Sequence, residues 1–137
     1  MKDHIATASY LLPYLVFGVL SCGSDKDKSD IKIEMMVVLE SEGNPENKEL
    51  QEMACQCIFH IRDWLSKWVT TQKEAIAKCK GRKSQKTQEI EISCQNIENF
   101  LHEIPHRTMA IAAYKCHANA RGLLHFEHYI YDQIEKR

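Results

Sequence analysis

Glycine and proline are scarce in this chain of 137 residues, with five and three copies respectively. β-Sandwiches and barrels need many turns, and these two residues are among the commonest turn formers. Their shortage therefore argues against such folds. Long apolar runs are missing as well, because Leu11–Leu20 falls short of the roughly 20 residues that a membrane-spanning helix needs. We expect an all-α fold with no membrane partner.

An excess of charge of one sign is also missing. Lys and Arg total 18, Asp and Glu total 19, and the net charge is −1. This balance gives no electrostatic reason to expect that the chain as a whole binds nucleic acid. The basic segment 81–89 is expected to be a flexible loop, and it lacks the interleaved aromatic residues that stack on bases. We therefore expect no direct nucleic-acid contact.

The six cysteines show neither a C-x-x-C pair nor a regular spacing. They are typical of small reduced side chains in the core of an intracellular protein. The N-terminal apolar run, followed by Ser21-Cys22-Gly23, also has the outline of a secretory signal peptide. Cleavage near Cys22 would leave an odd number of cysteines, which argues against that interpretation. It leaves one alternative, a secreted or membrane-anchored helical bundle with an N-terminal signal segment.

The motifs of common catalytic sites are missing too. The five glycines are isolated, so no glycine-rich loop is available to hold phosphates. The run His60-Ile-Arg-Asp63 resembles part of a kinase catalytic loop, but it lies within an amphipathic helical pattern and no asparagine follows at the expected position. We predict no catalytic residue and no cofactor-binding residue.

Potential zinc ligands occur in pairs at helix-compatible spacings. Pro105 separates one of these pairs, and another flanks Phe126-Glu127 without the general-base pattern of a metalloprotease helix. The sequence therefore predicts surface or partly buried histidines and no metal site. The pairs are Cys57 with His60, His102 with His106, and His125 with His128.

Helical periodicity is the main feature that the chain does contain. Apolar residues recur every three or four positions, which predicts about six helices. Polar segments connect them, and residues 22–30 are expected to be one such solvated connector. The expected helices span residues 6–20, 31–40, 47–78, 90–104, 106–116 and 121–136.

Two of the expected helices carry information about packing. Residues 6–20 leave almost no polar face, so this helix needs neighbours on several sides, and a chain of this length offers few. The helix over 47–78 carries a wide apolar stripe that reaches two neighbouring helices. Trp64 and Trp68 lie on one face of that helix and are expected to anchor the core.

The stretch from Phe100 to Ile130 is the most specific signal. Pro105 ends one helix, because the residue before a proline is pushed out of the α region. Alanines and Gly122 then allow two helices to approach closely, and Phe126 follows one turn later. This small-then-aromatic spacing resembles the second helix of a tetratricopeptide-type repeat. We expect an antiparallel HEAT/TPR-like α-solenoid segment, with packing roles for Trp64, Trp68, Phe100, Leu101, Pro105, Gly122 and Phe126.

A family resemblance rests on both ends of the chain. The first stretch is Ala6-Thr-Ala-Ser-Tyr-Leu-Leu-Pro-Tyr-Leu-Val16, and the second begins Phe100-Leu-x-x-Ile-Pro and ends His-Phe-Glu-x-Tyr-Ile130. Together they resemble the ATR checkpoint kinases, the DNA-damage-responsive members of the phosphatidylinositol 3-kinase-related protein kinases. The match covers most of the chain and is loose only through the connectors 22–47 and 79–89.

The resemblance implies a noncatalytic scaffold segment of a nuclear serine/threonine kinase that acts in the DNA damage and replication stress checkpoint. It implies that residues 1–80 end a HEAT-type solenoid and that residues 90–137 begin the FAT-domain repeats, with the basic loop 81–89 between them. The implied partners are the rest of the kinase solenoid and, for the full-length protein, the ATR-interacting protein. ATP and a divalent metal would belong to a kinase domain, for which this chain carries no motif.

Overall fold

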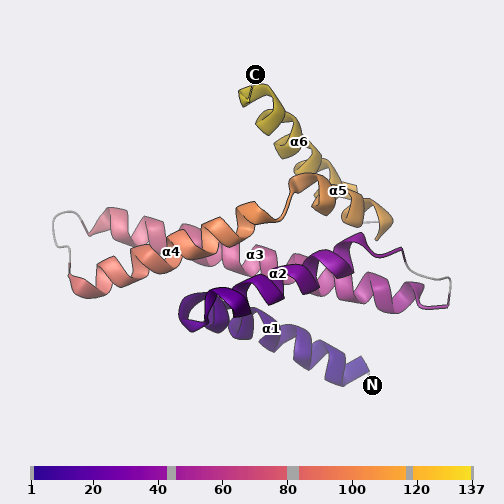
Figure 1. Cartoon of the computed structure of the whole chain (residues 1–137), viewed down its shortest axis with the longest axis horizontal. Helices are drawn as coiled ribbons and strands as arrows, with labels where there is room; N and C mark the ends of the chain where they lie inside the picture. Colours follow the sequence, from indigo (N-terminus) through magenta and orange to yellow (C-terminus); the bar gives the residue numbers. More distant parts are fainter. Residues whose placement is uncertain (1, 43–45, 80–83, 117–118, 137) are drawn as a thin grey trace.

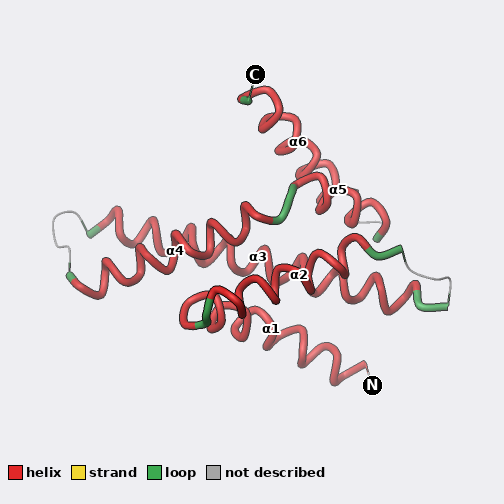
Figure 2. The backbone as a smooth tube through the Cα atoms, in the orientation of Figure 1, coloured by secondary structure: helices red, strands yellow, loops and turns green. Residues whose placement is uncertain are grey.

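The computed structural model describes residues 2–42, 46–79, 84–116 and 119–136 (Figure 1). Within these ranges it contains helices and loops and no strand (Figure 2). The predicted all-α fold of about six helices is thereby confirmed. The helices are α1 (Lys2–Cys22), α2 (Asp25–Glu40), α3 (Lys48–Lys78), α4 (Gln85–Glu103), α5 (His106–Lys115) and α6 (Asn119–Glu135).

Helix α3 is the longest element and the centre of the fold. It has 31 residues, and it packs against α1, α2, α4 and α5. The first four helices form a body, and α5 and α6 form a hairpin that projects from it (Figure 1). Among the described backbone contacts between elements, those of α6 are with α5. The hairpin therefore joins the body mainly through α5.

A continuous apolar core runs through α1 to α5. The periodicity of the sequence explains it, because residues three and four positions apart share one helix face. Helix α3 supplies Ile58, Ile61, Leu65 and Val69 at that spacing. The most completely buried apolar side chains of the core are Leu20, Leu39, Leu65, Ile97 and Met109.

Helix α2 begins earlier than its apolar pattern predicts. The segment 22–30 was expected to be a connector, but the structure starts the helix at Asp25. Ser24 and Asp27 form a capping box: the Ser24 hydroxyl accepts the Asp27 backbone N–H at 3.2 Å, and the Asp27 carboxylate accepts the Ser24 backbone N–H at 3.1 Å. Reciprocal caps of this kind satisfy N–H groups that a helix start leaves without partners. The polar, charged first turns are therefore helical.

Helix α4 also begins earlier, at Gln85, so residues 85–89 of the expected loop 81–89 are helical. The physical reason is again a cap, because the Ser84 hydroxyl accepts the Thr87 backbone N–H at 3.3 Å. A serine in this position stabilises a helix start by about 1 kcal/mol. The loop is thus shorter than predicted, and residues 81–83 lie outside the described ranges.

Helix α1 leaves much of its apolar surface exposed, as expected for a helix with too few neighbours. Tyr10 is 76% exposed and Leu15 is 64% exposed, whereas Val16 and Leu20 on the inner face are buried. None of the described helices combines the length and apolar character needed to cross a membrane.

Candidate functional site

The joint between the hairpin and the body contains the polar side chains of most interest. His125 of α6 is only 1% exposed, and its Nδ1 lies 3.1 Å from Nδ1 of His106, the first residue of α5. The His106 ring also stacks on the His128 ring, with 5.0 Å between centroids. One imidazole of the close pair must donate and the other must accept, which requires at least one unprotonated Nδ1. The contact therefore favours neutral rings.

Burial and positive neighbours both keep these rings neutral. Burial lowers the pKa of His125 to about 4, with the Arg62 guanidinium as the next cause. Burial also lowers the pKa of His106, and the Arg62 charge acts in the same direction. Among the described residues, His125 Nε2 is buried without a hydrogen-bond partner. The joint is thus an environment that strongly disfavours additional positive charge.

An ion pair ties α6 to α3 at the same joint. The Arg121 guanidinium donates to both carboxylate oxygens of Asp63, one of them at 2.8 Å. The same guanidinium lies over the Phe59 ring, 5.1 Å from its centroid. A two-pronged contact of this type fixes orientation as well as distance. It holds the first turn of α6 against the body.

The outer side of the hairpin carries an apolar groove of about 550 Å³. Tyr114 beside it is 76% exposed, Leu123 is 65% exposed and Phe126 is 52% exposed. The groove differs from an isolated exposed leucine, because its apolar residues are contiguous over two helices. Ala110 and Gly122 are small and less exposed than these three. The full lining is Ala110, Ile111, Tyr114, Gly122, Leu123 and Phe126.

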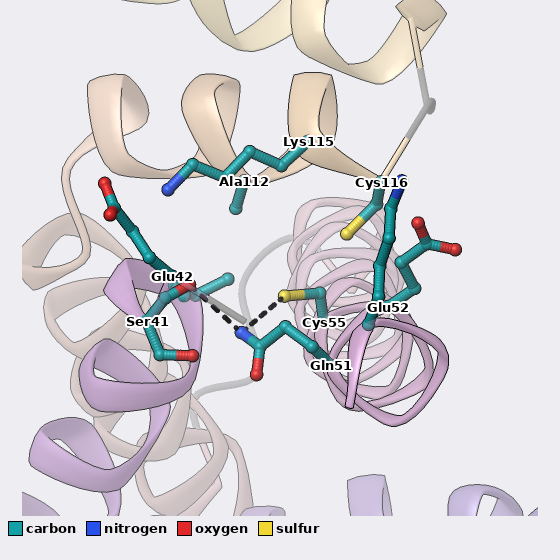
Figure 3. Close-up of a pocket in the computed structure, with 10 residues that line it drawn as sticks. Ser41, Glu42, Gln51, Glu52, Cys55, Ala112, Lys115 and Cys116 are labelled. Carbon is teal, nitrogen blue, oxygen red and sulfur yellow. Dashed lines mark hydrogen bonds between the residues drawn. The ribbon is translucent and has the colours of Figure 1, made fainter. Parts of the chain in front are cut away.

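A second pocket, of about 290 Å³, lies where α2 and α3 meet the end of α5 (Figure 3). The Gln51 side-chain amide donates to the Val38 carbonyl at 2.6 Å and approaches Cys55 Sγ at 3.8 Å. Figure 3 shows the thiols of Cys55 and Cys116 facing the same space. The pocket is lined by Leu39, Ser41, Glu42, Lys48, Gln51, Glu52, Cys55, Ala112, Lys115 and Cys116.

The two thiols of this pocket are poorly suited to nucleophilic chemistry. Burial raises the pKa of Cys55 to about 12, and burial also raises the pKa of Cys116. The thiolate is the reactive form of cysteine, so both side chains are unreactive near neutral pH. We interpret them as packing residues that connect α3 to α5.

The two tryptophans form an aromatic cluster with α1. Trp68 packs against Phe17 in an edge-on arrangement with 4.6 Å between ring centroids, and Trp64 lies 5.0 Å from Tyr14. Both indoles are partly buried against the core. The two indoles thus lie in the contact between α1 and α3.

The residues selected around Pro105 lie at the transition from α4 to α5. Phe100 is buried, and Leu101 is partly buried against the core. Pro105 is the N-cap position of α5 and is itself exposed. Helix α4 ends at Glu103, just before Pro105, where a helix end was expected because of the proline.

Gly122 and Phe126 both line the apolar groove, and the Phe126 side chain is half exposed there. A Cβ built on Gly122 would lie 3.6 Å from the Ala110 carbonyl oxygen and 3.7 Å from the Ala113 Cβ, which are ordinary contacts. An alanine would therefore fit here, and the close approach of the helices does not demand glycine.

The predicted ligand pairs do not assemble into a larger group. Over the described part of the chain, no three His, Cys, Asp or Glu side chains are placed to hold one metal ion. His106 is instead brought to His125 and His128, across the hairpin.

Comparison with known proteins decides the family. A family model described as the M-HEAT region of the serine/threonine-protein kinase ATR matches residues 1–137. The chain belongs to the ATR M-HEAT family. The match corresponds to this helical region and not to a kinase domain, and it includes residues 1–22 and both sides of the predicted boundary at 81–89.

Individual ATR relatives are similar over nearly the whole chain. The serine/threonine-protein kinase ATR of Oryza sativa subsp. japonica is 28% identical over 154 residues, which cover 95% of this chain. The ATR of Arabidopsis thaliana is 28% identical over 157 residues, with the same coverage. Protein kinase rad3 of Schizosaccharomyces pombe is 27% identical over an alignment of 134 positions, which covers 88% of this chain. No solved structure matches the chain.

The chain spans only about 6% of the length of these ATR relatives. Its match is therefore to one helical region of a much longer kinase. That placement gives the exposed apolar surfaces of α1 and of the groove a physical context, because stacked helical repeats bury such surfaces against their neighbours.

Sequence reasoning about this ATR-family segment missed the joint. Arg121 and Asp63 are 58 residues apart in the sequence, and no local spacing relates them. His125 was noted only as half of a potential metal pair. The sequence offers one signal for this role of His125: it lies one turn after Arg121, so both residues are on the same face of α6.

Proposed function

We propose that this chain is a noncatalytic scaffold segment of an ATR-like serine/threonine protein kinase that acts in the nuclear DNA damage and replication stress checkpoint. Its role is mechanical: it stacks between neighbouring helices of the kinase and passes their relative position along the array. ATP, a divalent metal and the ATR-interacting protein belong, in this proposal, to the full-length kinase.

The observation that supports this function best is the apolar groove of the hairpin. Its contiguous exposed side chains, including Tyr114, Leu123 and Phe126, resemble an interface more than a solvated surface. In Figure 1 the hairpin lies above the four-helix body and α1 lies at its lower side, and α1 has exposed apolar residues of its own, such as Tyr10 and Leu15. A segment that stacks on both sides needs such faces on both sides.

The buried thiols and the neutral histidine pair support a structural role in a different way. Cys55 has a raised pKa and His125 has a pKa of about 4, so neither is poised to exchange protons near pH 7. The alternative, a secreted or membrane-anchored bundle, is disfavoured because the ATR M-HEAT match includes residues 1–22.

The test introduces Leu123→Glu into the full-length kinase that contains this chain. If the groove is covered by a neighbouring helix, the new carboxylate is buried without a partner and the substitution costs several kcal/mol at that interface. We expect the variant kinase to lose soluble assembly and checkpoint phosphorylation after replication stress.

Ile92→Glu is the matched control, because Ile92 is comparably exposed but lies on α4 outside the groove. It should leave the kinase active. Circular dichroism of the 137-residue chain should show both variants as helical as the wild type, which separates loss of docking from misfolding. A fully active Leu123→Glu kinase would contradict the proposal.

A further inference from the structure

A polar groove lies on the body, next to the joint, and reaches the start of the hairpin. It follows one face of α3, is closed on the other side by α4, and ends at the first residue of α5. Its volume is about 370 Å³, which is near the lower end for ligand sites and suits a small group. The lining residues are Arg62, Ser66, Val69, Thr70, Lys73, Glu98, Leu101, His102 and His106.

Arg62 is the most unusual member of this groove. It is partly buried, and burial lowers the pKa of its guanidinium. No hydrogen bond or ion pair among the described residues involves it. The adjacent carboxylate, Asp63, is held by Arg121. The Asp63 charge still favours the protonated guanidinium of Arg62, but its oxygens are taken up by Arg121, so a partly desolvated guanidinium is left free to bind an anion.

The other charges of the groove leave this positive charge uncompensated. Lys73 and Glu98 form an ion pair with each other at the far part of the lining. Their charges cancel, and the two histidines that remain are His102 and His106. The pKa of His106 is lowered by burial and then by the Arg62 charge. The groove therefore carries a net positive charge that is concentrated on Arg62.

Hydrogen-bond donors converge on the groove from three helices. Ser66 comes from α3, His102 from α4 and His106 from α5. When Nδ1 of His106 accepts the Nδ1–H of His125, the neutral His106 ring carries its proton on Nε2 and can donate it to a ligand in the groove. A carboxylate has two oxygens in one plane and is satisfied by one guanidinium fork, whereas a phosphate offers three oxygens in different directions. Donors from several directions suit the tetrahedral anion.

We propose that this groove binds a phosphate group, carried by a monoester or present as the free ion, with Arg62 as its anchor and Ser66, His102 and His106 as further donors. The guanidinium fork contacts two phosphate oxygens, and the neutral donors contact the third oxygen and the outer lone pairs. Binding involves no covalent change. The site is independent of the apolar groove and adds a ligand to the scaffold role.

The experiment titrates the 137-residue chain with inorganic phosphate and with O-phosphoserine at constant ionic strength, using calorimetry and NMR of the histidine side chains. We expect saturable binding that shifts the resonances of His102 and His106. Loss of a charged bidentate contact in Arg62→Gln should weaken binding by about tenfold or more. Tighter binding of O-phosphoserine would assign the ligand to a phosphorylated side chain, and tighter binding of inorganic phosphate would assign it to the free ion.

The matched control is Lys67→Gln, which removes the same charge from an exposed position on α3 outside the groove. It should bind like the wild type. Ser66→Ala, a smaller change, should weaken binding by about threefold and keeps the test valid if Arg62→Gln does not fold. The proposal is overturned if no binding saturates, if Arg62→Gln binds phosphate as well as Lys67→Gln, or if acetate competes as well as phosphate does.

Discussion

Different interactions stabilise the body and the hairpin. In the body, α3 alone buries six residues in the apolar core. In the hairpin, α5 buries Met109 and three alanines. Among the described residues of α6, the buried side chain is His125. The body is thus a conventional apolar core, whereas α6 is attached through small-residue contacts to α5 and through polar contacts to α3.

This difference predicts which region is sensitive to core substitutions and which is sensitive to pH. Apolar burial stabilises in proportion to the area removed from water and does not depend on pH. The joint of His106, His125, Arg121 and Asp63 depends on protonation and geometry. The exposed apolar surface of the hairpin lies in the groove, on the outside of the chain. We therefore expect the two regions to respond differently to substitution and to acid.

The largest difference should appear on shortening a leucine in each region. Leu65 is fully buried at the centre of α3, whereas Leu123 is 65% exposed in the groove. Leu65→Ala leaves a cavity and should lower the free energy of unfolding by about 2–5 kcal/mol. Leu123→Ala should change it by less than about 0.5 kcal/mol.

Urea denaturation of both variants, followed by circular dichroism, measures the two free energies. Equal losses would mean that Leu123 is covered in the isolated chain and that the comparison between body and hairpin is wrong. An unchanged slope against urea concentration would confirm that the folded and unfolded states are otherwise comparable.

A smaller but selective effect should follow acidification. The pKa of His125 is about 4 in the folded chain, below the ordinary value of about 6.5. The unfolded chain therefore binds the proton first as the pH falls, and stability present above pH 6.5 is lost toward pH 4, by roughly 3 kcal/mol at most. The charged and titratable groups that act on His125 are Arg62, His106, Arg121 and His128.

The measurement compares unfolding free energies at pH 7 and at pH 4.5 for the wild type, His125→Gln and His60→Gln. His60 is exposed on α3 and serves as the control. The wild type and His60→Gln should lose similar stability on acidification, and His125→Gln should lose about 2 kcal/mol less. Identical losses in all three would exclude His125 as the source.

The smallest expected effect concerns two glycines. A Cβ at Gly122 meets only ordinary contacts, so Gly122→Ala should stabilise the chain by up to about 1 kcal/mol through helix propensity. At Gly23, which follows α1, a Cβ would lie 2.5 Å from the Val19 carbonyl oxygen. Gly23→Ala should therefore destabilise. Thermal melting orders the three proteins, and a destabilised Gly122→Ala would show that the hairpin packs more tightly than its contacts indicate.

Helix number and type could be predicted from the sequence because apolar spacing is a local property. The stripes that contain Leu65 and Ile97 are read directly from residues three and four apart. The apolar pattern does not predict the starts of α2 and α4, because their first turns are polar. Ser24 is followed three residues later by Asp27, which fits a capping box, whereas Ser84 is followed by Thr87, which that pattern does not include.

The joint could not be predicted in the same way. The pairing of Arg121 with Asp63 depends on how α6 lies against α3, and the pairing of His125 with His106 depends on how α6 packs on α5. No local pattern encodes either arrangement. The packing role of Phe126 stays a prediction, because its spacing from Gly122 predicts a shared face but not whether that face points inward. The predicted boundary between a HEAT-type part ending at residue 80 and a FAT-type part beginning at residue 90 stays a prediction.

Helix α6 is held over its first part, and its last turns form a lever arm. Contacts through Arg121, His125 and His128 fix the first part, and the helix ends away from the body (Figure 1). With 17 residues it is roughly 25 Å long. A rotation of about 10° at the joint would therefore displace the far tip by roughly 4 Å. A partner bound at the end of α6 would therefore be displaced by more than the width of an atom when the His106–His125 contact rotates slightly.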